Sequence, residues 1–460
     1  MMTMRHFDLA VIGSGSGNSL IDERFADWDI ALLDRGVAGG VFGGTCLNVG
    51  CIPTKMFVLP ADLAASGPEA KRLGVDLRFV SADWPAIRDR IFGRIDPISA
   101  GGEDWRRRNE NVTLYRAETR FVGPKQLDTG TGEVITADRI VLAAGSRAVI
   151  PDWPGIDTVR VHTSDTVMRL ETLPETMMIV GGGFIAAEFA HVFSAFGTRV
   201  SIVNRSELLL RHEDREISRR FTEEMSEQVE VLATTSVTSV SALEGDRVRV
   251  VLSNGETRDV DVLLVATGRT PNSDTLDLSR TGVAVADDGY VEVDEFQRTS
   301  VDGIFALGDI SSRHQLKHVA NHEMRVVQHN LLHPDDLMAA DHRFVPHAVF
   351  SEPQVAAVGL TEDEAREQGL DIAVAVQEYG SVAYGWALED TRHCCKLIAD
   401  RTTGQLVGAH LIGPQASSLI QPLIQAMSFG LGVKDMARGQ YWIHPALPEV
   451  VENALLALDV

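Results

Sequence analysis

The stretch Phe7–Asn18 reads FDLAVIGSGSGN, a short apolar run followed by a glycine-rich turn. Such a run is typical of a buried parallel strand, and the turn is expected to lead into a helix. Gly13 permits a tight turn, and Gly15 lets the backbone approach a pyrophosphate at the helix N-terminus. Asn18 takes the third glycine position, and Asp34 follows the next apolar run at the distance where an acid binds ribose hydroxyls. Strand, turn, helix and acid together predict a dinucleotide-binding unit.

A second stretch, Met177–Ala186, repeats the pattern as MMIVGGGFIA, with Gly181 and Gly183 at the equivalent positions. Each unit also ends in a similar apolar strand and turn, at residues 140–146 and 263–269. Two nucleotide-binding units in one chain predict an α/β fold with two Rossmann-like domains.

The second unit lacks the acid that an NAD site places after its second strand. At that position the chain has Asn204 and Arg205, with Arg211 six residues further on. An NAD site uses a carboxylate for the 2′-hydroxyl, whereas an NADP site uses cations for the 2′-phosphate. The alternative is that both arginines are solvated surface residues. The sequence therefore favours NADPH at the second unit.

The segment Gly43–Lys55 reads GGTCLNVGCIPTK and holds two of the four cysteines of the chain. In a regular helix Cys46 and Cys51 would lie too far apart to form a disulfide, which needs Cα atoms roughly 4.4–6.8 Å apart. A bond between them therefore requires a distorted backbone, for which Gly43, Gly44 and Gly50 provide freedom. Thiols at a helix N-terminus gain thiolate character, which predicts a catalytic dithiol/disulfide.

A structural role for these cysteines is less favoured. Four cysteines in 460 residues are typical of a reducing compartment. A structural zinc site needs a second ligand pair, and the other cysteines are the adjacent Cys394 and Cys395. Those two lie in an apolar run that predicts a strand, where neighbours point to opposite faces. We expect them to be packing residues, and we expect no metal site.

The bulk properties exclude several classes of function. At ~150 residues per domain, 460 residues suggest about three domains. A net charge of −23 argues against nucleic acid or an anionic membrane as a partner. No apolar run approaches the ~18 residues of a membrane span, and the N-terminal residues 1–6 lead directly into a strand without a signal peptide. These features predict a cytoplasmic protein.

Domain boundaries follow from these units. The segment Gly303–Asp309 is one more buried strand with a polar turn, which we expect to return to the first unit. From about residue 335 strands and helices alternate, which predicts a separate α+β domain. The predicted division is 1–150 and 272–334 for the first domain, 151–271 for the second and 335–460 for the third.

Near the C-terminus, His444 and Glu449 flank a proline-rich loop. Pro445 and Pro448 argue against a regular helix between them and predict a rigid loop before a helix from residue 450 to 458. An imidazole held by a carboxylate is a general acid/base whose pKa suits thiol chemistry. On its own such a histidine is more often structural. The dithiol upstream favours the catalytic interpretation.

These motifs resemble the flavoprotein disulfide reductases across essentially the whole chain. That family includes glutathione reductase, lipoamide dehydrogenase and mercuric reductase. The redox motif appears at Gly43–Lys55 without a departure, an ATG[RT]xPN motif at Ala266–Asn272, a GD motif at Gly308–Asp309, and HPxxxE at His444–Glu449. Three further stretches resemble the members that reduce the disulfide of a sugar-linked thiol, at residues 14–19, 317–323 and 439–444.

The resemblance implies a homodimer with FAD in the first domain, NADPH in the second and a C-terminal dimerisation domain. It implies that Cys51 faces the flavin and that Cys46 attacks a small disulfide substrate. It further implies that Lys55 and Glu188 form an ion pair beside the flavin, and that His444, oriented by Glu449, acts from the other subunit. The implied FAD-binding residues are Gly13, Gly15, Asp34, Gly44, Thr45, Lys55, Gly145 and Asp309. The implied NADPH-binding residues are Gly181, Gly183, Phe184, Ile185, Arg205, Arg211 and Gly268, with Phe184 over the nicotinamide.

Charge bears on which disulfide is reduced. Residues 18–24 are expected to form a helix toward the substrate cleft, with two acids against one arginine. With the net charge of −23, this predicts poor binding of an anionic disulfide such as glutathione disulfide. Glutathione reductase, another low-molecular-weight disulfide reductase and a slow flavin redox sensor stay as alternatives. Lipoamide dehydrogenase is less favoured because it is NAD-linked and carries an acid where this chain has Asn204.

Overall fold

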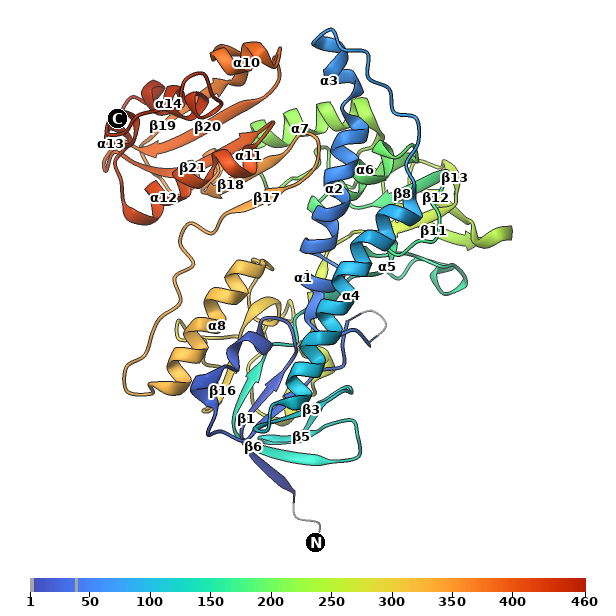
Figure 1. Cartoon of the computed structure of the whole chain (residues 1–460), viewed down its shortest axis with the longest axis vertical. Coiled ribbons are helices and arrows are strands. Elements are labelled where there is room, and N and C mark those ends of the chain that lie inside the picture. The colour runs from blue at the N-terminus through green and yellow to red at the C-terminus, as the bar shows by residue number, and fades with distance from the viewer. Residues whose placement is uncertain (1–3, 38–39) are drawn as a thin grey trace.

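A computed structural model of the chain describes residues 4–37 and 40–460 (Figure 1). Residues 1–3, which belong to the N-terminal stretch from which we expect no signal peptide, lie outside the described residues. None of the helices in the described ranges has the length and apolarity needed to span a bilayer. The fold is mixed α/β, as the sequence predicts.

A seven-stranded sheet forms the first unit around β1 (Arg5–Ile12), whose second half is buried. β1 pairs in parallel with β2 (Ile30–Leu33) and β6 (Val134–Leu142), so the carboxyl ends of all three strands meet at one edge. The other strands are β3 (Val112–Tyr115), β4 (Arg120–Gly123), β5 (Gln126–Asp128) and β16 (Ile304–Ala306). As the sequence predicts, β16 returns to this sheet, and it pairs in parallel with β6.

The prediction of a helix after the first glycine-rich turn is wrong. Two short 3₁₀ helices replace it, η1 (Gly17–Leu20) and η2 (Glu23–Phe25). The buried guanidinium of Arg106 donates to the backbone oxygens of Asn18 and Ile21, at 2.8 Å for Ile21. A regular α-helix needs those oxygens for its own N–H groups. Arg106 therefore stabilises an irregular segment in its place.

The second unit contains a parallel sheet in the order β10 (Glu230–Leu232), β9 (Arg199–Val203), β8 (Thr176–Val180) and β14 (Val262–Val265). Here the glycine-rich turn does open a regular helix, α6 (Phe184–Ala195). An antiparallel sheet and two further helices complete the unit: β11 (Val237–Ala242), β12 (Val248–Leu252), β13 (Thr257–Val260), α5 (Ser164–Val167) and α7 (Arg215–Gln228). A ribbon of β7 (Ser146–Ala148) and β15 (Arg269–Pro271) joins the two units.

The C-terminal region is a separate α+β layer, seen in orange and red in Figure 1. Its sheet runs β17 (His347–Val349), β18 (Val355–Gly359), β21 (Gln405–Ile412), β20 (Cys394–Asp400) and β19 (Ile372–Glu378). Its helices are α9 (Glu362–Glu367), α10 (Ala383–Ala387), α11 (Ala416–Leu419), α12 (Gln421–Phe429), α13 (Val433–Arg438) and α14 (Pro448–Ala457). α14 starts two residues earlier than expected because proline is tolerated in the first helical turn.

The remaining cysteines are packing residues, as predicted. Cys394 and Cys395 are both fully buried at the start of β20. Cys394 belongs to the hydrophobic core shared with the second unit, and Cys395 belongs to the core of the C-terminal layer. Neighbouring residues of a strand point to opposite faces, which explains this division.

The redox segment spans two consecutive helices. α1 (Gly44–Asn48) and α2 (Cys51–Ala65) follow one another, and α2 continues into α3 (Gly67–Arg72). α4 (Trp84–Arg108) packs along α2, and α8 (Lys317–Leu332) lies on the other side of the first sheet (Figure 1). The side chain of Phe57 on α2 stacks on Trp84 of α4 with ring centroids 4.9 Å apart. The redox segment is thus fixed against a rigid scaffold.

Candidate active site

One cavity of about 1980 Å³ extends from the first nucleotide unit to the second. Every residue expected to bind FAD or NADPH lines it, and so do Cys46, Cys51 and Glu188. Sites for drug-sized ligands usually measure about 300–1,000 Å³, so this cavity has room for two large cofactors. His444 and Glu449 are not part of its lining.

The first end of the cavity fits a dinucleotide. Gly13 has φ +114°, and a Cβ atom there would lie 2.2 Å from the backbone oxygen of Ala143. The turn therefore requires glycine and presents its backbone to the cavity. The carboxylate of Asp34 accepts a hydrogen bond from the backbone N–H of Ser14 at 3.1 Å and pairs with Arg116. This fixed acid, at the end of β2, suits ribose hydroxyls.

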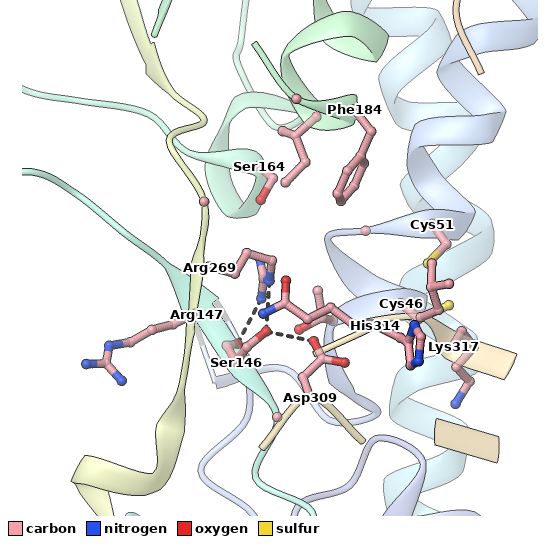
Figure 2. Close-up of a pocket in the computed structure, with 18 of the residues that line it drawn as sticks. Cys46, Cys51, Ser146, Arg147, Ser164, Phe184, Arg269, Asp309, His314 and Lys317 are labelled. Carbon is pink, nitrogen blue, oxygen red and sulfur yellow. Dashed lines mark hydrogen bonds between the residues drawn. The ribbon is translucent and has the colours of Figure 1, made fainter. Parts of the chain in front are cut away.

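In the middle of the cavity, a series of hydrogen bonds crosses the β7–β15 ribbon that joins the two units. Ser146 Oγ donates to a carboxylate oxygen of Asp309 at 2.7 Å, and Arg269 Nε donates to the same Ser146 Oγ at 2.8 Å (Figure 2). Glu323, which is buried on α8, accepts the backbone N–H of Gly308 at 2.6 Å. These contacts hold the GD segment in one conformation.

At the second end of the cavity, Asn204 fixes the shape of a loop. Its side-chain amide donates to the backbone oxygens of Ser206 and Leu208, both at 2.9 Å. These bonds shape the loop so that Arg205 and Arg211 both line the cavity. Within the described part of the chain neither arginine forms an ion pair. The guanidinium groups are therefore available to an anion.

The two reactive cysteines lie on either side of a break between helices. Cys46 is in α1, and Cys51 is the first residue of α2. Gly50 between them has φ −137° and ψ −124°, outside the helical region. This is the backbone distortion that the sequence predicts. A Cβ on Gly44 would lie 2.6 Å from the Cα atom of Gly15, so α1 rests directly on the first glycine-rich turn.

Both cysteines are free thiols that lie side by side (Figure 2). The hydrogen bond from Cys46 lowers the pKa of Cys51 to about 7, against the opposing effect of burial. The same contact, together with burial, raises the pKa of Cys46 well above its usual value. Thiolate character therefore concentrates on Cys51, whereas the expectation from the sequence gave it to both residues.

An ion pair connects α2 with α6. Lys55 Nζ lies 2.7 Å from Glu188 Oε1, which also accepts the backbone N–H of Phe350 at 2.9 Å. The Lys55 ammonium sits 3.6 Å from the centre of the Phe350 ring. Burial lowers the pKa of Lys55, and Glu188 opposes that change. Phe184, at the start of α6, projects toward this part of the cavity (Figure 2).

His444 and Glu449 form the expected pair but lie away from the cysteines of the same chain. His444 Nδ1 is 2.7 Å from Glu449 Oε1, and the hydrogen bond lowers the pKa of Glu449. The His444 side chain is 71% exposed. Residues 18–24 also lie outside the lining of this cavity. Asp22 pairs with Arg24 and accepts a hydrogen bond from Gln328 of α8. That their acids face the substrate stays a prediction.

Several residues of the site were not predicted. Ser16 and Lys317 line the cavity, and Ser146 links Arg269 to Asp309. Arg269 and Lys317 lie within stretches that the family resemblance singles out, so a signal was present in the sequence. Nothing in the sequence pairs Arg116 with Asp34, because the two are separated by 82 residues.

Comparisons with known proteins agree with this geometry. Residues 7–324 match the family model described as pyridine nucleotide-disulphide oxidoreductase, and residues 345–455 match its dimerisation domain. The chain is 56% identical to a Mycobacterium tuberculosis (strain ATCC 25618 / H37Rv) protein named mycothione reductase, over 99% of this chain and 100% of that protein. It is 32% identical to a dihydrolipoyl dehydrogenase of Chlamydia muridarum (strain MoPn / Nigg), with 98% and 97% covered.

A solved structure of the HOCl-induced flavoprotein disulfide reductase RclA from Escherichia coli is similar, with a TM-score of 0.85, 28% identity, and 98% of this chain and 99% of that chain covered. The chain therefore belongs to the pyridine nucleotide-disulphide oxidoreductase family and is an NAD(P)H-dependent disulfide reductase that uses FAD, with a dimerisation domain that supports a homodimer.

Proposed function

We propose that the enzyme reduces mycothione, the disulfide of mycothiol, with NADPH as the electron donor. The observation that carries the proposal is the adjacent pair Cys46 and Cys51 inside a cavity with a nucleotide-binding turn at each end. The relative at 56% identity is named for this substrate. The stretches at residues 14–19, 317–323 and 439–444 support the same assignment.

The cysteines exchange with the substrate in two balanced steps. The Cys46 thiolate attacks one sulfur of the substrate, the S–S bond breaks, and the first thiol leaves as a thiolate that takes up a proton. Cys51 then attacks the Cys46 sulfur of the mixed disulfide, which releases the second thiol and forms the Cys46–Cys51 disulfide. Gly13, Asp34 and Asp309 would hold FAD beside Cys51, where FAD would supply the electron pair from NADPH that returns the disulfide to the dithiol.

The chain's own residues prepare these steps. Lys55, held by Glu188, keeps a positive charge beside Cys51 and the flavin site. Asp34 and Asp309 take the ribose and ribityl hydroxyls, and Phe184 covers the nicotinamide. Arg205 and Arg211 bind the 2′-phosphate, because both are free of carboxylates and face the cavity.

His444 acts on the thiols from the other subunit. Its exposed imidazole and its distance from the cavity of its own chain support this arrangement, and Glu449 holds the ring by Nδ1. Nε2 is then free to take the proton of Cys46 and to return a proton to the leaving thiol. The proposed domains are 1–150 with 272–334 for FAD, 151–271 for NADPH and 335–460 for the dimer contact. The low cysteine content supports a reducing cytoplasm as the place of action.

Anaerobic titration of the FAD-loaded enzyme with NADPH, followed by a panel of disulfides, tests the proposal. We expect reduction of flavin and dithiol, and reoxidation by mycothione in preference to glutathione disulfide and lipoamide. A reduced enzyme that no disulfide reoxidises would indicate a redox sensor instead.

A further inference from the structure

Lys317 brings a second lysine, besides Lys55, to the cavity of the redox centre. It is the first residue of α8 and lines the cavity that contains both cysteines (Figure 2). Its Nζ donates to Ser16 Oγ at 2.9 Å, and Ser16 Oγ donates to Asn321 Oδ1 at 3.2 Å. These bonds tie the start of α8 to the first glycine-rich turn and fix the position of the ammonium group.

The two lysines differ in their partners. Lys55 forms an ion pair with Glu188 at 2.7 Å. Lys317 has only neutral hydrogen-bond partners, and no carboxylate of the described residues forms an ion pair with it. The field of a cation in an ion pair is partly offset by its partner, whereas a cation held by a hydroxyl has no opposing charge beside it. The positive charge of Lys317 is therefore not offset by a carboxylate in an ion pair.

The charged and titratable groups around Cys46 come from three other elements. They are Cys51 on α2, Asp309 in the GD segment and Lys317 on α8, of which only Lys317 lowers the pKa of Cys46. His314 lines the same cavity, and burial lowers its pKa, so that it adds little charge at neutral pH. Without Lys317, Cys46 would face only groups that disfavour its thiolate.

We propose that Lys317 stabilises the thiolate of Cys46 and so promotes its attack on the substrate disulfide. This role rests on the proposed function, in which Cys46 is the attacking thiol and the partner's His444 takes its proton. Lys317 takes no part in the bond changes and exchanges no electrons. Its ammonium offsets the negative charge that forms on Cys46 before the S–S bond of the substrate breaks.

The size of the effect follows from thiol reactivity. Cationic neighbours lower a cysteine pKa by about one unit or more. Each unit of higher pKa cuts the thiolate fraction tenfold and makes the remaining thiolate about threefold more nucleophilic, since the Brønsted coefficient is ~0.4–0.5. Loss of Lys317 should therefore slow attack about 3- to 10-fold at neutral pH.

The test compares Lys317→Met with Lys317→Arg in the NADPH-reduced, FAD-loaded enzyme. Alkylation of Cys46 by iodoacetamide is followed against pH, with mass spectrometry to separate Cys46 from Cys51. We expect Lys317→Met to move the Cys46 profile about one unit or more to higher pH and to slow reoxidation by disulfide about 3- to 10-fold. Lys317→Arg should have the wild-type alkylation profile of Cys46 and the wild-type rate of reoxidation. Flavin reduction should be unchanged in each variant. Lys71→Met, an exposed lysine of α3 outside the cavity, is the matched control.

Two outcomes would overturn the proposal. One is an unmoved Cys46 profile in Lys317→Met, and the other is equal slowing in Lys317→Met and Lys317→Arg, which would show a packing role. If Lys317→Met loses FAD, Lys317→Gln keeps a donor for Ser16 while removing the charge, and the same readouts apply. The alkylation profile does not depend on which disulfide is the substrate, so failure of the mycothione assignment leaves this test valid.

Discussion

Lys55 Nζ lies 2.7 Å from Glu188 Oε1, and this pair joins the helix that starts at Cys51 to the helix that opens the second nucleotide unit. The Glu188 side chain is only 10% exposed and also accepts the Phe350 N–H, so the pair is held in one position. In the proposed mechanism, a fixed cation at this point would stabilise the negative charge that develops on a reduced flavin. The pair thus joins the proposed FAD site to the proposed NADPH site.

Replacement of Lys55 by Met should slow reduction of the bound flavin by NADPH about 10²-fold, a typical loss when one preorganised electrostatic group is removed. Rapid-mixing absorbance of the flavin measures this step. Glu188→Gln keeps an acceptor for the Phe350 N–H and should have a smaller effect. Unchanged flavin reduction in Lys55→Met would contradict the assigned role.

The two cysteines should differ in their spectroscopic effect. A Cys51 thiolate beside oxidised flavin should give a long-wavelength absorbance band in the two-electron-reduced enzyme. Cys46→Ser should keep such a band and lose disulfide turnover, whereas Cys51→Ser should lose the band. Normal turnover in both variants would show that the dithiol is not catalytic.

The band should also depend on pH. The thiol of Cys51, with its pKa lowered to about 7, is charged above that value and neutral below it. The band should therefore grow as the pH rises through about 7 and fade as it falls below that value. Titration of the NADPH-reduced enzyme between about pH 5 and 9 measures it. A band that grows as the pH falls would show that it arises from another group.

Cofactor choice should depend on Arg205 and Arg211. Hydrogen bonds to charged groups contribute about 1.5–3 kcal/mol each, so the two together supply better than hundredfold discrimination. Replacing both by Gln should raise the KM for NADPH strongly and leave kcat/KM for NADH nearly unchanged. Steady-state assays with both nucleotides decide this, and a wild-type enzyme that prefers NADH would refute it.

His444→Gln should slow reoxidation by disulfide about 10²–10⁴-fold, the usual contribution of general acid–base catalysis, without slowing flavin reduction. A mixed dimer tests which subunit supplies this residue. If His444 acts across the dimer, a Cys46→Ser subunit paired with a His444→Gln subunit has one intact site. Random mixing of the two inactive variants should then recover about a quarter of the wild-type activity. No recovery would place His444 in the site of its own chain.

Much of this architecture could be predicted from local sequence. Residues 7–18 and 177–186 each combine a buried strand with a glycine that the turn requires, and such local rules hold in the structure. The missing helix at 18–24 could not be predicted, because the buried Arg106 that replaces its hydrogen bonds is 85 residues from Ile21. Lys317 carried no recognisable chemistry until the fold placed it in the cavity with Cys46.

The enzyme's preference for its substrate is the most direct test of the central proposal. Glutathione disulfide carries several carboxylates, whereas mycothione presents neutral amide, sugar and inositol groups. The chain has a net charge of −23, which disfavours an anionic substrate.

The decisive measurement is therefore kcat/KM for mycothione and for glutathione disulfide, with saturating NADPH and the same FAD-loaded enzyme. We predict a value for mycothione at least about a hundredfold higher, which corresponds to about 2.7 kcal/mol of transition-state stabilisation. Equal or better use of glutathione disulfide would contradict the assignment to mycothione.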